Sequence, residues 1–199
     1  MRVSCTDSDI KVVIKKIKAG KIIVFPTDTV YGIGCDPYNK KAVLRLYEIK
    51  KRERVKLFPV LGLSKMELEK IAEFNTLEEK IAEKFWPGQV TLILKVKDEK
   101  IQQSLCLDKK IAVRVPNNQC VLTLLKECKF LVGTSANISG TAPFTDPDEC
   151  SKNLIGYDLL VDGGIIPSQS ESTIVEIVEG SIKILREGNV SEKEMRGLN

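Results

Sequence analysis

Short apolar runs alternate with segments of helical periodicity along most of this chain. The first such segment starts near Asp7 or Ser8, which can cap a helix. Its apolar positions follow the i, i+3, i+4, i+7 spacing from Ile10 to Ile17, and Gly20 ends it. The same reasoning from caps and periodicity predicts further helices over residues 40–50, 64–74, 76–85, 118–128 and 147–155.

Strands are predicted where short runs are rich in β-branched and other apolar residues. These runs are residues 22–25, 57–63, 90–96, 111–115, 130–132, 159–161, 173–178 and 182–185. Strands and helices alternate over the first two-thirds of the chain, and the last two strands form a hairpin across Glu179–Gly180. This order predicts an α/β fold with one mixed sheet, largely covered by helices, in a single domain over residues 1–199.

Two predicted strands run directly into polar loops. Pro26 ends the strand at 22–25 because it cannot donate to a ladder, and the loop after it carries hydroxyls, one carboxylate, one phenol and two glycines. A second loop, Gly133–Gly140, leaves its strand in the same way. Ligands of α/β proteins usually bind at the carboxyl ends of strands, so both loops are candidate binding elements. Taken alone, Gly32 and Gly34 indicate only a tight turn, because the third glycine of a dinucleotide fingerprint is missing.

The composition is that of a globular protein with one sizeable core. Of 199 residues, 43% are hydrophobic and 29% are charged, and no apolar run approaches the roughly 20 residues of a membrane helix. The first residues show no signal-peptide pattern, so we expect a cytoplasmic protein. The net charge of +4 could serve anionic ligands without requiring nucleic acid.

Histidine is absent from the sequence, which removes Ser-His-Asp and Cys-His catalysis, His-ligated zinc and imidazole acid–base chemistry. Any catalysis must then rest on positioning and electrostatics, or use Lys, Asp, Glu or Tyr as acid or base. The cysteines form no C-x-x-C pair, and we expect reduced core residues at Cys5, Cys35, Cys106, Cys120, Cys128 and Cys150.

Several short motifs occur together in one order. They are Pro26–Gly34, Lys50-x-Arg52, Trp86-Pro87-Gly88-x-x-Thr91, Val113–Pro116, Thr134-Ser135-Ala136-Asn137-x-Ser139-Gly140, Ser172-Thr173 and Leu185-Arg186-x-Gly188. Through them the chain resembles the YrdC-type family of threonylcarbamoyl-AMP synthases, over about residues 8–188. Each motif is modest alone, but all of them in order are hard to obtain by chance. Glu171 stands where many relatives have proline.

The resemblance implies a twisted α/β fold, YrdC-like, with a positively charged concave face. There L-threonine, bicarbonate and ATP would give threonylcarbamoyl-AMP and pyrophosphate, the first step of N6-threonylcarbamoyladenosine formation on tRNA. The missing histidine is compatible with this reaction, because the carbamate made from threonine and bicarbonate can itself attack the α-phosphorus. The resemblance also implies Mg²⁺ with ATP, held mainly by phosphates and water, and a downstream threonylcarbamoyl-transferase complex.

The matched motifs assign residues to two ligands. Threonine would be bound by Thr27, Tyr31, Arg114, Ser135 and Ser172, with the planar arginine fork on its carboxylate. ATP would be bound by Lys50, Arg52, Arg54, Asn137, Thr145 and Arg186. The residues carried over as catalytic are Lys50, Arg52, Ser135 and Asn137.

Other interpretations stay open at this point. Lys50, Arg52 and Arg54 could form a solvated helix end, where the macrodipole favours basic residues, and Tyr31 could be a core tyrosine. An RNA-binding module without catalysis is an alternative function, although the sequence offers few aromatic residues for base stacking. A third is a carbamoyl-adenylate enzyme of the hydrogenase-maturation type, for which we would expect zinc-finger and acylphosphatase regions.

Overall fold

The computed structural model describes residues 1–168 and 170–196. Its elements are, in chain order, β1 (Arg2–Ser4), α1 (Asp7–Lys18), β2 (Ile23–Phe25), β3 (Gly32–Gly34), α2 (Lys40–Lys50), β4 (Pro59–Gly62), α3 (Lys65–Leu68), β5 (Ala72–Glu73), α4 (Thr76–Phe85), β6 (Val90–Val96), α5 (Glu99–Ser104), β7 (Lys110–Arg114), α6 (Gln119–Cys128), β8 (Phe130–Val132), β9 (Thr134–Ser135), α7 (Pro147–Asn153), β10 (Leu159–Asp162), β11 (Thr173–Val178), β12 (Ser181–Arg186) and α8 (Glu192–Arg196).

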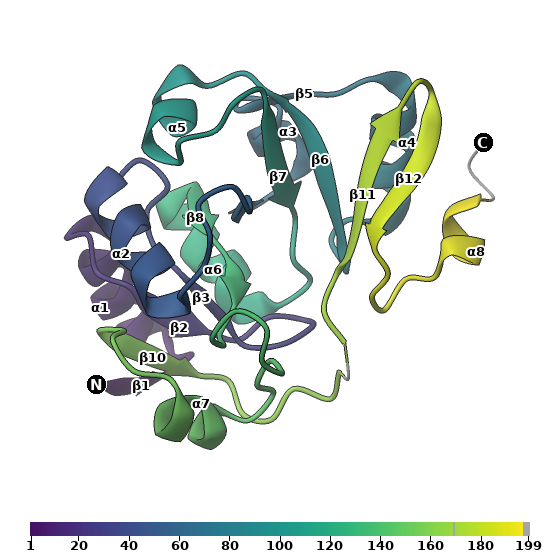
Figure 1. Ribbon diagram of the computed structural model, residues 1–199. Coiled ribbons are helices and arrows are strands. Elements are labelled where there is room, and N and C mark those ends of the chain that lie inside the picture. Colours follow the sequence, from purple (N-terminus) through teal and green to yellow (C-terminus); the bar gives the residue numbers. More distant parts are fainter. Residues whose placement is uncertain (169, 197–199) are drawn as a thin grey trace.

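The strands form two sheets, where the sequence predicts one (Figure 1). A five-stranded sheet has the order β1-β10-β2-β3-β9, and a seven-stranded sheet has the order β12-β11-β6-β7-β4-β8, with β5 paired to β6 off this path. Both sheets are mixed: β2 is parallel to β10 and antiparallel to β3, while β6 is parallel to β11 and antiparallel to β7. The predicted mixed α/β class is confirmed, and the single sheet is wrong because apolar runs identify strands without identifying their partners.

The two sheets meet where the chain passes from β8 to β9. Gly133 lies between these strands, and a Cβ on Gly34 at the end of β3 would lie 1.6 Å from the carbonyl oxygen of Val132. Gly32 leaves room for the Phe25 ring, which a Cβ would approach to 2.9 Å. The glycines of β3 therefore belong to a strand packed tightly against its neighbours. The tight turn that the sequence indicates there is wrong.

Most predicted helices are found within two residues, and the caps account for the differences. Thr6, rather than Asp7 or Ser8, caps α1, and its hydroxyl accepts a backbone N–H of the first turn. Asn75 caps α4 in a reciprocal capping box with Glu78. Adjacent Thr, Asp and Ser residues are all good caps, so composition alone does not select one.

The helix predicted over 64–74 is wrong beyond its first turn. α3 ends at Leu68, and the chain then extends as β5, in which Ala72 pairs with Val96 at the end of β6. Pairing with another strand stabilises this extended backbone, which local propensity cannot anticipate. The elements that the sequence analysis misses are all short: β1, β3, β5, β9, α5 and α8.

The cysteines differ from the prediction of six reduced core residues. Cys5, which follows β1, forms a disulfide with Cys120 in the first turn of α6. The free thiols are the buried Cys35 and Cys150, the half-buried Cys128 and the exposed Cys106. The disulfide joins positions 115 residues apart that only the packing of α1 on α6 brings together, so no sequence pattern marks it.

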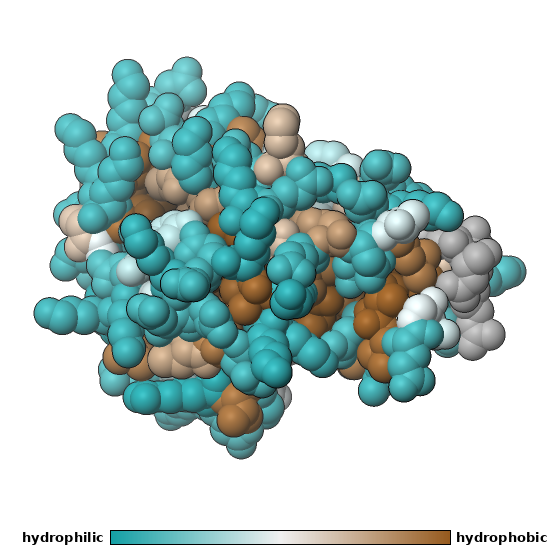
Figure 2. Space-filling model, turned by 90° about the horizontal axis from the view of Figure 1, so that it is seen from above, coloured by the Kyte–Doolittle hydropathy of each residue, from teal (hydrophilic) through white to brown (hydrophobic). Residues whose placement is uncertain are grey.

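Within residues 1–168 and 170–196, no helix is both long and apolar enough to cross a membrane. Figure 2 shows hydrophilic residues over most of one face, with apolar residues visible in its middle and toward one end. Leu185 of β12 is 47% exposed and also lines the cavity described next.

Candidate active site

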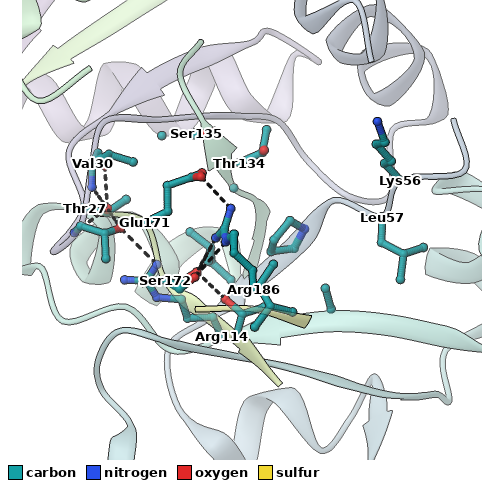
Figure 3. A pocket seen from close by; sticks show the side chains of 18 of the residues that line it. Thr27, Val30, Lys56, Leu57, Arg114, Thr134, Ser135, Glu171, Ser172 and Arg186 are labelled. Carbon is teal, nitrogen blue, oxygen red and sulfur yellow. Dashed lines mark hydrogen bonds and ion pairs between the residues drawn. The ribbon is translucent and has the colours of Figure 1, made fainter. Parts of the chain in front are cut away.

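A cavity of about 300 Å³ is lined by residues of both sheets (Figure 3). Its floor is one face of the seven-stranded sheet. In β4, β6 and β7 the lining residues alternate with residues of the core behind the sheet, because successive side chains of a strand point to opposite faces. The floor residues of these strands are Pro59, Leu61, Thr91, Ile93, Ala112 and Arg114. The volume lies at the lower end of the range for small-molecule sites, about 300–1,000 Å³.

The walls come from segments far apart in the sequence. The loop after β2, the β8–β9 connection, the segment after α2 and the two strand ends at β11 and β12 all contribute. Polar and charged side chains on these walls are Thr27, Thr29, Arg52, Lys56, Thr134, Ser135, Glu171, Ser172 and Arg186. In Figure 3, Lys56 and Leu57 lie on the side of the cavity away from Thr27 and Arg114.

The structure brings together about half of the residues that the sequence assigns to the site. Those that line the cavity are Thr27, Arg52, Arg114, Ser135, Ser172 and Arg186. Those that do not line it are Tyr31, Lys50, Arg54, Asn137 and Thr145.

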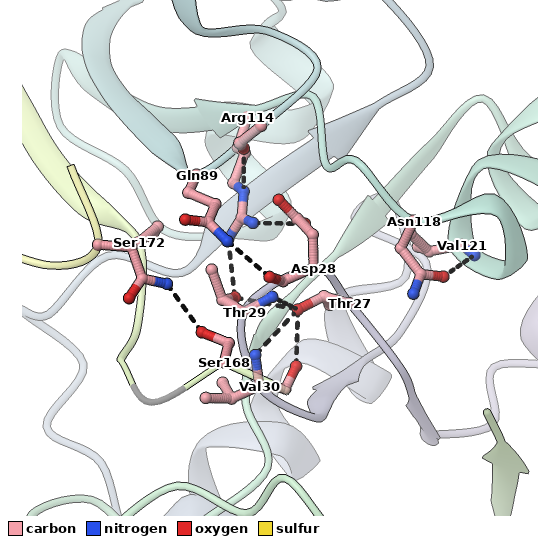
Figure 4. A network of polar contacts seen from close by, with 12 residues as sticks. Thr27, Asp28, Thr29, Val30, Gln89, Arg114, Asn118, Val121, Ser168 and Ser172 are labelled. Carbon is pink, nitrogen blue, oxygen red and sulfur yellow. Dashed lines mark hydrogen bonds and ion pairs between the residues drawn. The ribbon is translucent and has the colours of Figure 1, made fainter. Parts of the chain in front are cut away.

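Arg114, at the end of β7, carries a buried guanidinium that is held on three sides (Figure 4). Its Nε donates to the carbonyl oxygen of Gly88 at 2.8 Å, its Nη1 to Thr29 Oγ1 at 3.3 Å, and its Nη2 to Asp28 Oδ1 at 2.6 Å. Burial lowers the pKa of Arg114, and Asp28 opposes this shift. The second oxygen, Asp28 Oδ2, is buried without a hydrogen-bond partner in the described part of the chain. The guanidinium fork is therefore fixed in one orientation, which suits a planar carboxylate.

Thr27 uses its hydroxyl to shape its own loop. Its Oγ1 donates to the carbonyl oxygen of Val30 at 2.6 Å and accepts the N–H groups of Thr29 and Val30 at 3.1 and 3.3 Å. Such a turn releases the chain from β2 and places Thr27, Thr29 and Val30 on the cavity wall. The proton and both acceptor positions of the Thr27 hydroxyl are thus used within this loop.

Lys50, the last residue of α2, contacts the Ser135–Asn137 turn and does not line the cavity. Only 1% of the residue is exposed, and its Nζ donates to the carbonyl oxygens of Ser135 and Asn137 and to Asn137 Oδ1. Ser135 Oγ donates to the same Asn137 Oδ1 at 2.7 Å. Burial, followed by the nearby charge of Arg52, lowers the pKa of Lys50 to about 7. All three donors of the ammonium are used, so Lys50 holds the Ser135–Asn137 turn in place.

Arg52 lines the cavity and is held by its own segment. Its Nη2 donates to the carbonyl oxygen of Leu57 at 2.9 Å and its Nε to that of Lys56 at 3.2 Å, while the guanidinium lies 5.3 Å from the Phe58 ring centroid. Burial lowers the pKa of Arg52. The cation-bearing segment 52–57 is thereby folded back onto the cavity.

Ser172 and Arg186 form a second fixed group. Arg186 donates through Nε and Nη2 to the carbonyl oxygen of Ser172 at 3.1 and 2.8 Å, and Nη2 also lies 3.1 Å from Ser172 Oγ. Thr91 Oγ1 lies 2.9 Å from Ser172 Oγ. The remaining amino group, Arg186 Nη1, forms an ion pair with Glu171 at 2.8 Å.

Three assigned residues lie away from this geometry. Tyr31 is fully buried, and its hydroxyl donates to the carbonyl oxygen of Gly164 at 2.8 Å, so it occupies the core rather than the cavity wall. Burial raises its pKa to about 12. Arg54 is exposed, and the backbone of Thr145 pairs with Ile166 at the base of α7.

Other lining residues are not among those that the sequence analysis assigns to the site. Glu171, Lys56 and the apolar floor have no motif of their own in the sequence. Thr91 does stand in a matched motif, and its place two residues before Ile93 puts both residues on one face of the predicted strand. A strand-face argument is therefore the signal that could have found the floor.

The family model for Sua5, YciO and YrdC, described as "Telomere recombination", matches residues 15–188. The chain belongs to this family. A Methanocaldococcus jannaschii protein with the provisional name of threonylcarbamoyl-AMP synthase is 39% identical over 175 residues, which are 87% of this chain and 83% of that protein. Threonylcarbamoyl-AMP synthase of Pyrococcus abyssi is 33% identical over 184 residues, 90% of this chain but 54% of that protein.

Solved structures of Sua5 and YciO share the fold. P. abyssi Sua5 complexed with L-threonine has a TM-score of 0.89 at 29% identity, covering 100% of this chain and 59% of that one. Escherichia coli YciO has a TM-score of 0.88 at 25% identity, covering 96% of this chain and 94% of that one. The predicted YrdC-like fold is confirmed, and the chain spans little more than half of P. abyssi Sua5.

Proposed function

We propose that this family member is an L-threonylcarbamoyladenylate synthase, a nucleotidyltransferase that makes threonylcarbamoyl-AMP and pyrophosphate from L-threonine, bicarbonate and ATP. The observation that carries the proposal is one cavity that holds three fixed arginines, Arg52, Arg114 and Arg186, together with hydroxyl groups. The names of the relatives support the activity, and the complex of P. abyssi Sua5 with L-threonine supports the amino-acid substrate.

The threonine end is proposed at Arg114. Its fork is oriented by Asp28 and Gly88 and can take both oxygens of the amino-acid carboxylate. Thr27 and Ser172 also line the cavity (Figure 3), and we assign them to the amine and the side-chain hydroxyl of threonine. A contact of threonine with Thr27 Oγ1 would replace one of the hydrogen bonds that this hydroxyl makes within its loop. Ser135, across the cavity in β9, completes this set.

The nucleotide end is proposed at Arg52 and Arg186, which face the phosphates directly. Lys50 and Asn137 do not line the cavity; they fix the turn whose Ser135 lines it. Lys50 is thus a positioning residue in this proposal, in place of the phosphate contact that the resemblance implies. Arg54 and Thr145 lie outside the cavity, so any nucleotide contact of theirs would need ligand atoms that extend beyond it.

The reaction needs no nucleophile from the protein. The threonine ammonium and bicarbonate give the carbamate with loss of water and a proton; a carbamate oxygen then bonds to the α-phosphorus, and the bond to pyrophosphate breaks. What the chain supplies is alignment of the two substrates and positive charge at the phosphates. This accounts for catalysis by a chain without histidine.

Mg²⁺ enters as part of the ATP substrate in this proposal. Among residues 1–168 and 170–196 there is no group of three or more Asp, Glu, Cys or His side chains that could hold a metal ion. Phosphate oxygens and water are accordingly the ligands that we propose for Mg²⁺.

The test is pyrophosphate release from ATP by the purified protein, with threonine and bicarbonate supplied together and separately. We expect release only when both are present. Pyrophosphate release that does not depend on threonine, or no release at all, contradicts the proposal. Carbamoyl phosphate in place of threonine and bicarbonate tests the alternative carbamoyl-adenylate activity.

The adenylate product is labile and must pass to a second enzyme, so a threonylcarbamoyl-transferase complex in the cytoplasm and a contact with tRNA belong to the same proposal. Tight RNA binding that falls steeply with salt, without any nucleotide turnover, would instead favour an RNA-binding module.

A further inference from the structure

Glu171 brings a negative charge into a cavity whose other charged lining residues are cations. Among the described residues that line the cavity, it is the one with a carboxylate. Its Oε2 lies 2.8 Å from Arg186 Nη1, and the two side chains point toward one another in Figure 3. With 30% and 37% of these side chains exposed, the pair lies at the open part of the cavity, within reach of a ligand.

The same carboxylate acts on the other cations of the site. Glu171 raises the pKa of Lys50 and of Arg52, opposing their burial. Arg186, in contrast, lowers the pKa of Arg52. Glu171 therefore partly neutralises three positive charges that otherwise repel one another.

Arg186 does not depend on Glu171 for its position. Its Nε and Nη2 are held by Ser172, and only Nη1 faces the carboxylate. The backbone at Glu171 is held separately, since its carbonyl oxygen accepts the N–H of Asn189 at 3.2 Å. Release of the ion pair thus needs the rotation of one glutamate side chain, while the guanidinium and the backbone stay where they are.

We propose that Glu171 is a built-in competing anion, which occupies the anion subsite at Arg186 until a phosphate group of the nucleotide displaces it. The identity of the incoming anion rests on the proposed function. A phosphate and the carboxylate compete for the charge of the same guanidinium, and their own like charges repel, so Glu171 weakens nucleotide binding. Partly exposed ion pairs of this kind are weak, and we expect their removal to tighten binding roughly two- to fivefold.

The test compares Glu171→Gln with Glu187→Gln, which removes the same charge one residue from Arg186 but outside the cavity. ATP and inorganic pyrophosphate are titrated calorimetrically into each full-length protein, once with Mg²⁺ and once with EDTA. We expect Glu171→Gln to lower both dissociation constants roughly two- to fivefold in either solution, and Glu187→Gln to leave them unchanged. Glu171→Ala should reproduce the gain, and circular dichroism checks that each variant is folded.

Unchanged or weaker binding by Glu171→Gln overturns the inference, and so does an equal gain in Glu187→Gln. Weakening confined to the Mg²⁺ solution also overturns it, because it identifies Glu171 as a metal ligand. Since binding is measured without turnover, these results are separate from the synthase assay. A protein that makes threonylcarbamoyl-AMP without the Glu171→Gln gain would refute this inference alone.

Discussion

Replacing Lys50 with methionine removes a buried ammonium while keeping a side chain of similar length. Burial and the nearby Arg52 lower the pKa of Lys50 from 10.5 to about 7. In the unfolded chain the lysine regains its ordinary pKa. Between these two values the unfolded chain binds more protons than the folded protein, so stability rises with pH across this window. Below pH 7 both states are charged and the full cost of burying the charge is present.

The magnitude follows from the difference between the two pKa values. A fall from 10.5 to about 7 corresponds to about 5 kcal/mol, at about 1.4 kcal/mol for each pKa unit. Linkage places about 2.7 kcal/mol of this between pH 6 and pH 9, where unfolding is readily measured. The methionine variant lacks the titrating group and also its hydrogen bonds. Loss of these hydrogen bonds changes the stability of the variant by an amount that is separate from the titration of the ammonium. The pH dependence of the stability difference is therefore the quantity that tests the burial of the charge.

The assay is urea unfolding of the wild type, Lys50→Met and Lys41→Met at pH 6, 7.5 and 9. We expect the free energy of unfolding of the wild type, minus that of Lys50→Met, to rise by about 2.7 kcal/mol from pH 6 to pH 9. Lys41 is exposed on the same helix, so its variant should follow the wild type. A difference between wild type and Lys50→Met that is constant over this range refutes the buried-charge account of Lys50.

Four further predictions concern the arginines, their partner Asp28 and the disulfide. Asp28→Asn should raise the KM for threonine about tenfold with a smaller change in kcat, because Arg114 loses its charged partner. Steady-state kinetics measures both constants, and a fall in kcat alone would contradict the role of Asp28 in positioning Arg114. Arg114→Met should lower the free energy of unfolding by about 3–5 kcal/mol in urea, since it leaves a buried carboxylate unpaired, and a loss below 1 kcal/mol would speak against that pairing. Under denaturing, non-reducing conditions, Cys5 and Cys120 should not react in a thiol titration, and reaction of both before reduction would show that the bond is absent. Reduction should lower the free energy of unfolding by up to about 5 kcal/mol, because the disulfide joins positions 115 residues apart. Arg52→Ala should weaken ATP binding at unchanged circular dichroism and threonine affinity.

The regular part of the fold could be predicted because its signals are local. The helix over residues 40–50 and the strand over 90–96 are found at the predicted positions, since periodicity and apolar runs are properties of neighbouring residues. The division into two sheets depends instead on the close approach at Gly34, which is decided by a segment about a hundred residues away. The same holds for β5, which is extended because it pairs with β6.

The candidate site shows the same limit at the level of single side chains. The motifs correctly gather Arg52, Arg114 and Arg186 around one cavity. They do not distinguish a residue that faces the cavity from one that supports it from behind, as Lys50 does. Tyr31 shows why: within one motif, neighbouring residues of a strand or turn point to opposite sides, and only packing decides which side is the core.

The cations in and behind this cavity share a property that bears on how it binds anions, because each already has a partner. Lys50 is held by backbone and side-chain oxygens, Arg52 by two carbonyl groups, Arg114 by Asp28 and Arg186 by Glu171 and Ser172. Partners that are neutral carbonyls orient a cation without reducing its charge, whereas carboxylates both orient and neutralise it. The charge of Arg114 is largely balanced by Asp28, so its contribution to binding is mainly the fixed orientation of its guanidinium. A fixed guanidinium suits selective binding of a single carboxylate group. Arg52, whose hydrogen-bond partners are neutral carbonyl groups, keeps more of its charge for the phosphates. Arg186 has a carboxylate partner that is 30% exposed, so a bound anion can exchange for an internal one at this position. Nucleotide affinity should therefore respond most directly to changes there.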